Sequence, residues 1–196
     1  PPASLANYDV LVGNWNTFGS STPVGWPQPL MNAFTNFIRQ GGGFVVVHAG
    51  GSVLYDWPDF QRIVGATWGS GTGHGPKHSF SVDIADTNHP VTAGVIPFST
   101  SDELWHRMAT NSELHVLATA FSAVDKGGSG QNEPVAFVTQ LGKGRCFNLV
   151  LGHDTEAMTA AGFRILLVRG TEWAATGKVT APAVPCPSTA EVNRAQ

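Results

Sequence analysis

Two histidines stand just after apolar runs of the sequence, where an imidazole can reach a ligand. His48 follows the run at residues 44–47, and His153 follows the run at 145–150. In open parallel sheets, ligands bind beyond the carboxyl ends of the strands, so we predict that both imidazoles lie at one site. Gly50, in the turn after His48, lets the backbone turn sharply or approach a ligand closely. The structural alternative for His48 is a capping role, in which its ring bonds a loop carbonyl.

The segment DELWH, residues 102–106, places a carboxylate and a third imidazole close together. Alternate residues of an extended segment face opposite ways, so Glu103 and His106 share a side only if the strand bends or has ended there. We include both among the candidate catalytic residues. Trp105, between them, is a candidate for ligand contact.

His74 and His78 lie in a loop with glycine at every second position from 69 to 75. Their i, i+4 spacing would match two metal ligands on a helix, but the glycines and Pro76 exclude a helix there. The pair is therefore a weak zinc motif, and we expect both rings on a mobile loop beside the site. His89 and His115 are expected to have structural roles.

Charge and hydropathy exclude some classes of partner. Charged residues make up 13% of the 196 residues and the net charge is -3, which argues against nucleic-acid binding and against a polybasic membrane anchor. No apolar run approaches the roughly 20 residues that a membrane helix needs. Low lysine content and many small polar residues favour an exported protein. Because the chain opens on Pro1 without Met, we also expect that an upstream segment has been removed.

The length fits one α/β domain, which we place at residues 1–178, followed by a proline-rich tail at 179–196. Cys146 and Cys186 form neither a metal motif nor a redox pair. They are either two unrelated thiols or a disulfide that ties the tail to the domain, and the disulfide would need an oxidising compartment.

The first half of the chain alternates between strand and helix patterns. Residues 9–13 and 44–47 are predicted as parallel strands, because the second is a continuous apolar run that is typical of a strand covered on both faces. Between them, Gln28–Arg39 carries apolar residues on one helical face. A short helix is predicted at Trp57–Val64, with Asp56 as its N-cap.

The second half favours antiparallel strands, because the predicted strands follow one another through short connections. The strict alternation at 79–84 indicates a half-buried strand. Further strands are predicted at 115–120, 134–139 and 145–150, and a final helix at Glu156–Ala175. One mixed α/β sheet with helices on its faces is the economical architecture.

An ordered set of segments resembles the ThuA-like (trehalose utilisation) family. The segments span about residues 8–180 and are GGGFVVVHAG, GHGPKHSFSVDI, HPVTAGV, DELWHR, HVLATAF, EPVAFVTQLGKGR, LGHD and RGTEWAATGKV. The resemblance implies a flavodoxin-like fold of the class I glutamine-amidotransferase-like superfamily, a three-layer mixed sheet with helices on both faces. It also implies a link to carbohydrate metabolism, since family members often accompany oxidoreductases that make 3-keto sugars, and many are secreted or periplasmic.

Two departures from the family pattern stand out. The nucleophilic cysteine of an amidotransferase would stand in the turn after the 44–47 strand, where this chain has His48, Ala49 and Gly50. Neither Ala nor Gly can attack a carbonyl, so thiol-dependent glutamine hydrolysis is excluded. The family's N-terminal strand and helix, which precede the strand near residue 8, are expected to be absent from this chain.

These observations lead to the hypothesis of a sugar-processing enzyme that acts on an oxidised, 3-keto substrate. The carbonyl acidifies neighbouring C–H bonds, and removing such a proton needs a base near pKa 7 and a cation or donor at the developing enolate oxygen. The predicted catalytic residues are His48, Glu103, His106 and His153. The predicted substrate-binding residues are His74, His78, Gly50, Trp105 and Asp154, with Trp68 as another residue on which a sugar ring can stack.

Three questions stay open at this point. Glu103 acts either as a partner acid or, with the histidines, as a ligand of a divalent metal such as zinc. The alternatives to an acid–base enzyme are a non-catalytic carbohydrate-binding module and a zinc-dependent hydrolase that uses the same histidines. The expected partner is a small-molecule sugar, and a homo-oligomer is compatible with the sequence.

Overall fold

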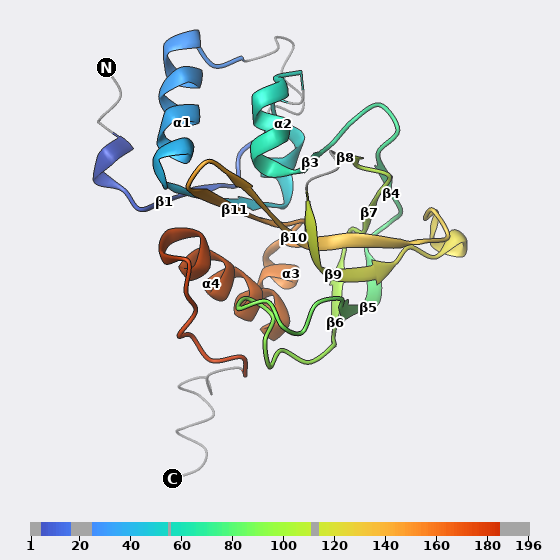
Figure 1. Cartoon of the computed structure of the whole chain (residues 1–196). Helices are drawn as coiled ribbons and strands as arrows, with labels where there is room; N and C mark the ends of the chain where they lie inside the picture. Colours follow the sequence, from blue (N-terminus) through green and yellow to red (C-terminus); the bar gives the residue numbers. More distant parts are fainter. Residues whose placement is uncertain (1–4, 17–24, 55, 111–113, 185–196) are drawn as a thin grey trace.

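A mixed sheet of seven strands runs through the computed structural model, which describes residues 5–16, 25–54, 56–110 and 114–184 (Figure 1). The strands, in sheet order, are β1 (Val10–Gly13), β2 (Gly43–Val47), β11 (Gly144–Leu149), β10 (Asn132–Leu141), β9 (His115–Phe121), β5 (His78–Ile84) and β6 (Phe98–Asp102). Two short ribbons lie beside this sheet. They are formed by β3 (Ala66–Thr67) with β8 (Ala109–Thr110), and by β4 (Gly73–His74) with β7 (Trp105–His106).

Helices cover both faces of the sheet, as Figure 1 shows. On one face lie α1 (Gln28–Gln40) and α2 (Pro58–Val64); on the other lie α3 (Thr155–Thr159) and α4 (Ala161–Thr176). Three short 3-10 helices complete the described elements: η1 (Leu5–Asn7), η2 (His48–Ser52) and η3 (Val124–Lys126). Within these described ranges, no helix combines the length and the apolar character that crossing a membrane requires.

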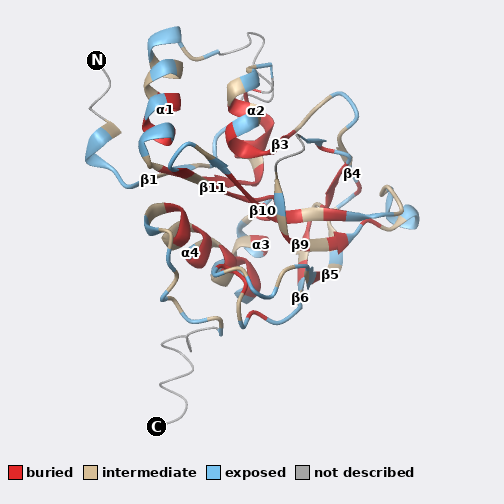
Figure 2. Ribbon diagram, in the orientation of Figure 1, coloured by how far each residue is buried: buried red, intermediate tan, exposed pale blue. Residues whose placement is uncertain are grey.

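The core is built around β2, which is buried along its whole length. Its side chains alternate between the two faces of the sheet. Val45 and Val47 pack in the cluster that includes α4, whereas Phe44 and Val46 pack in the cluster that includes α1 and α2. Figure 2 shows buried residues concentrated in β11 and β10 and in parts of α2 and α4. This burial on both faces agrees with the continuous apolar run in the sequence.

Strand directions follow the predicted division of the chain into two halves. β1 pairs with β2 in parallel, and β2 pairs with β11 in parallel. The remaining pairings, β11 with β10, β10 with β9, β9 with β5 and β5 with β6, are antiparallel. The predicted mixed α/β architecture and the predicted parallel strands near residues 9–13 and 44–47 are therefore confirmed.

Two local predictions are wrong. The single helix predicted at Glu156–Ala175 is broken at Ala160, whose extended backbone ends α3 and precedes α4. The break lets α3 contact β6 while α4 packs on β2 and β11. In α2, Pro58 does occupy the first turn, but the N-cap position belongs to Trp57, without a side-chain cap, and not to Asp56.

The turn after β2 is strained and closely packed. His48 has φ = 39°, a left-handed conformation that costs a non-glycine residue free energy and is often found at functional sites. Two residues on, a Cβ atom added to Gly50 would lie 2.2 Å from the carbonyl oxygen of Gly13, at the end of β1. A residue without a side chain at position 50 therefore allows the turn that carries His48 to pack directly against β1.

We predict that Gly50→Ala lowers the free energy of unfolding by about 1–3 kcal/mol, because the added methyl group must displace backbone rather than a flexible side chain. Urea denaturation followed by tryptophan fluorescence measures the change. Gly71→Ala is the matched control, since a Cβ atom there meets nothing within 4 Å, and it should change stability by no more than about 0.5 kcal/mol. Equal effects of the two substitutions would contradict the close approach.

Candidate active site

A pocket of about 470 Å³ lies at the edge of the sheet where β2 and β11 end. Four titratable side chains and two tryptophans form most of its wall. The lining residues are Asn16, His48, Ala49, Trp68, His74, Glu103, Trp105 and His153. The predicted location of a site beyond the carboxyl ends of parallel strands agrees with this position.

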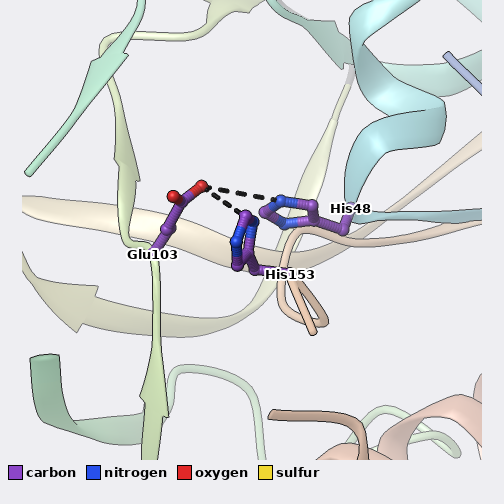
Figure 3. A group of neighbouring side chains, drawn as sticks. All are labelled: His48, Glu103 and His153. Carbon is purple, nitrogen blue, oxygen red and sulfur yellow. Dashed lines mark ion pairs between the residues drawn. The ribbon is translucent and has the colours of Figure 1, made fainter. Parts of the chain in front are cut away.

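His48, Glu103 and His153 converge in this pocket, and Figure 3 shows their side chains pointing toward one another from three separate segments. Oε2 of Glu103 lies 3.0 Å from Nδ1 of His153 and 4.0 Å from Nε2 of His48. The two imidazole rings are 5.4 Å apart between centroids. The prediction that His48 and His153 lie near each other is confirmed, and Glu103 joins them.

The ring of His48 is held in one orientation and largely excluded from solvent. Its Nδ1 lies 2.7 Å from the carbonyl oxygen of Val150, which can only accept, so Nδ1 carries the proton and donates it. In the neutral ring, Nε2 then presents its lone pair toward Glu103. Burial lowers the pKa of His48, and the hydrogen bond to Val150 opposes this effect. The result favours a neutral imidazole with an accepting Nε2.

Asp102 fixes the backbone around the other two side chains. Its carboxylate is fully buried and accepts hydrogen bonds from three backbone N–H groups, those of Glu103 (2.8 Å), Gly152 (2.7 Å) and His153 (3.1 Å). It therefore joins the end of β6 to the loop after β11, which carries His153. Sequence reasoning missed this role, although a carboxylate next to Glu103 at the end of a strand was a visible signal.

The outer part of the pocket is formed by His74 and by two tryptophans. Nδ1 of His74 lies 3.7 Å from Oε1 of Glu103 and 2.8 Å from the carbonyl oxygen of Gly75. The rings of Trp68 and Trp105 meet edge to face at 4.9 Å, and Trp105 lies 4.7 Å from the ring of His48. The pocket therefore combines an aromatic wall with a cluster of proton-accepting groups.

His106 and His78 do not line the pocket, contrary to expectation. His106 follows Trp105 in β7, and consecutive strand residues face opposite ways. Its ring is buried beneath Gly73, where a Cβ atom would lie 3.1 Å from it. Nδ1 of His78 lies 2.9 Å from the carbonyl oxygen of Pro76, and its ring packs beside Phe80.

Two of the predicted substrate-binding residues also lie outside the pocket lining. Asp154 caps α3 by accepting a hydrogen bond from the backbone N–H of Ala157, and it forms an ion pair with Lys77 at 2.6 Å. Gly50 lines a neighbouring apolar cavity on the side of β1. These contacts explain structurally why Asp and Gly stand at positions 154 and 50. Trp105 and His74, in contrast, line the pocket as predicted.

His89 and His115 lie elsewhere, as the sequence indicated. Their rings are 5.7 Å apart, Nε2 of His115 forms an ion pair with Asp86 at 2.9 Å, and His89 packs on Trp173. Asn16, in contrast, lines the pocket and was missed. It lies in a polar segment in which no local pattern distinguishes an asparagine of a site from an asparagine of an ordinary loop.

Comparison with known proteins identifies the family of this chain. The family model described as trehalose utilisation, ThuA, matches residues 2–174. The chain belongs to the ThuA family. A ThuA-like protein from Parabacteroides merdae is 30% identical, with a TM-score of 0.82 over 95% of this chain and 76% of that protein. None of the curated proteins matches.

Two more distant structures share the fold of this ThuA family member. A ThuA-like protein from Bacteroides uniformis is 19% identical, with a TM-score of 0.65 over 89% of this chain and 74% of its own. A protein of Salmonella typhimurium described as cytoplasmic is 12% identical, with a TM-score of 0.63 over 87% and 73%. At these identities the likeness concerns the fold alone.

In the described residues of this ThuA family member, no cysteine lines the pocket. The turn after β2 carries His48, Ala49 and Gly50. Cys146 is a free thiol buried in the cluster that contains Phe34 and Phe44, and burial raises its pKa well above the usual value. Cys186, the other half of the disulfide considered from the sequence, lies outside the described residues.

We predict that Asp102→Asn destabilises the protein by about 1–3 kcal/mol, because the amide group of asparagine cannot accept from all the backbone N–H groups that now face the carboxylate. Chemical denaturation measures the loss. Asp83→Asn serves as the control, since Asp83 is exposed on β5, and its substitution should alter stability by no more than about 0.5 kcal/mol. Wild-type stability in Asp102→Asn would show that the three hydrogen bonds are not needed.

Proposed function

We propose that this ThuA family member is an enzyme that acts on an oxidised sugar, the 3-keto form of a sugar or glycoside, by acid–base chemistry. Membership of the family implies a carbohydrate-related role. The observation that supports the finer proposal is the convergence of His48, Glu103 and His153 in an open pocket with an aromatic wall. A pocket of this size, lined by few polar groups, suits a small ligand.

His48 is the proposed general base. Its Nδ1–H is engaged with the carbonyl of Val150, so only Nε2 is available to take a proton. A C–H bond beside a sugar carbonyl is acidic enough for an imidazole to remove its proton, provided that the developing enolate oxygen is stabilised. Because burial lowers the pKa of His48, the ring stays in the neutral form that a base requires.

The pair of Glu103 and His153 is the proposed proton donor. Nδ1 of His153 is within hydrogen-bond distance of Oε2 of Glu103, at 3.0 Å. The side chain of His153 is 42% exposed and that of Glu103 is 18% exposed, so the pair links the pocket to solvent, where protons exchange. Such a pair can deliver a proton to the sugar and be reprotonated after each cycle.

Trp68 and Trp105 are the proposed binding surface for the sugar. The ring of Trp68 is partly exposed next to His74, and the ring of Trp105, which is 3% exposed, lies behind it against His48. Aromatic faces pack against the C–H surface of a ring, while the polar groups of the pocket orient its hydroxyl groups. A non-catalytic carbohydrate-binding module, the main alternative, would use these tryptophans alone. It would have no use for a buried imidazole facing a carboxylate.

Two expectations from the family resemblance stay proposals. One is the flavodoxin-like arrangement of the class I glutamine-amidotransferase-like superfamily within the α/β fold. The other is export of the protein. Both are independent of the chemistry proposed for the pocket.

We predict that Glu103→Gln lowers turnover of a 3-keto disaccharide by about 10²–10⁴-fold, since a lost general acid or base typically costs that factor. Loss of a single binding hydrogen bond changes affinity by no more than roughly tenfold, so the assay separates an enzyme from a binding module. Turnover is measured by product formation, and exchange of the proton beside the carbonyl by NMR in D₂O.

His115→Gln is the control, because His115 is exposed and remote from the pocket, and it should retain wild-type turnover. Circular dichroism shows whether each variant is folded. Near-full activity of Glu103→Gln would refute the role of the DELWH segment. If the wild type processes no oxidised sugar, with or without added divalent metal, the binding-module alternative is favoured.

A further inference from the structure

The three side chains at the centre of the pocket also have the donor atoms and the spacing of a metal-binding site. One nitrogen each from His48 and His153 and one carboxylate oxygen of Glu103 lie within 4.8 Å of one another. Among the residues that the structure describes, no other group of three His, Cys, Asp or Glu side chains meets this condition.

The distances between the three candidate ligand atoms are close to those expected around one shared cation. Two ligands that are each about 2.1 Å from an ion lie about 3.0 Å apart at a right angle and about 3.4 Å apart at the tetrahedral angle. Oε2 of Glu103 is 3.0 Å from Nδ1 of His153 and 4.0 Å from Nε2 of His48. The distance between Glu103 and His153 therefore already matches a shared ion, whereas the distance between Glu103 and His48 must shorten when an ion binds.

Hydrogen bonds from neighbouring groups orient the candidate ligands, as they do in metal sites. A histidine that binds a metal through one nitrogen usually donates its other N–H to a carbonyl or carboxylate, which fixes the ring and its tautomer. Nδ1 of His48 has this contact with Val150, at 2.7 Å. Asp102 fixes the backbone N–H groups of Glu103 and His153, so the two remaining ligands are also positioned before any ion binds.

The charge of the pocket points to a cation as well. Glu103 is mostly buried, and its ion-pair partners in the described chain are three histidines and no lysine or arginine. No lysine or arginine lines the pocket in the described residues. A carboxylate removed from solvent needs positive charge nearby. A bound divalent cation compensates Glu103 without protonating an imidazole.

We infer that His48, Glu103 and His153 bind one divalent transition-metal cation, with Zn²⁺ as the best-fitting occupant. Two imidazole nitrogens and one carboxylate oxygen are a donor set that suits Zn²⁺ and other late divalent metals better than Mg²⁺ or Ca²⁺. Three protein ligands leave at least one position open toward the pocket for water or a substrate oxygen.

The inference deepens the proposed function. Binding of the ion does not depend on that function, but a catalytic role of the ion rests on it. A cation and a proton compete for the same lone pairs, so the metal-loaded site and the proton-transfer site are two states of one cluster. In the loaded state the ion provides the positive charge at the sugar carbonyl. His74 also lines the pocket, and it is then the imidazole that does not bind the ion.

The test is direct metal binding by protein made without a polyhistidine tag and stripped with a chelator. Zn²⁺ is titrated by calorimetry, and Co²⁺ by its visible absorption, which reports the coordination. We expect one cation per chain. His153→Ala and Glu103→Gln should each weaken binding by at least about tenfold, because removing even outer-sphere support costs 10–100-fold in affinity. Melting temperatures show that the variants remain folded, since the side chain of His153 is 42% exposed.

His115→Ala is the matched control, since His115 also faces a carboxylate, that of Asp86, at 2.9 Å, and its loss should leave affinity unchanged. Absence of stoichiometric binding to the wild type, or wild-type affinity in either pocket variant, overturns the inference. Keto-sugar turnover by stripped protein is measured in parallel. Turnover without metal binding rejects the cation site and keeps the proposed function. Metal binding without turnover keeps the cation site and rejects the proposed function.

Discussion

The buried carboxylate of Asp102 is the interaction on which the candidate site depends. It is fully buried and accepts from three backbone N–H groups, which belong to two segments about fifty residues apart in the sequence. A buried charge is stable only when its hydrogen-bonding capacity is used. The same contacts that stabilise the charge therefore fix Glu103 relative to His153, and the chemistry of the pocket rests on a folding requirement.

The parallel part of the sheet, formed by β1, β2 and β11, supplies the third member of the cluster. β2 and β11 run side by side, so His48 and the loop that carries His153 leave the sheet at the same edge. The backbone strain at His48 is maintained because Gly50 packs against Gly13 and because the carbonyl of Val150 accepts a hydrogen bond from the His48 ring. Both histidines therefore follow strands that lie in the buried part of the sheet.

How far the sequence predicts this arrangement depends on the kind of contact. His48 and His153 were predicted together because strand ends and apolar runs are local signals. The sequence did not decide which of Glu103 and His106 lies in the pocket, since that depends on where a strand ends. Asp102 and the break at Ala160 depend on which distant segments meet, and no periodicity encodes that. Asp154 was predicted to bind the substrate, yet its carboxylate caps a helix and forms an ion pair with Lys77.

Lys77 gives the two walls of the pocket different sensitivities to ionic strength. It follows His74 on the glycine-rich loop and forms ion pairs with Asp154 and Glu156, each at 2.6 Å, which raise its pKa. These pairs are partly exposed, so dissolved salt screens them. The buried hydrogen bonds of Asp102 on the inner wall are screened far less. High salt therefore weakens the contacts that anchor the loop carrying His74 more than it weakens the inner cluster.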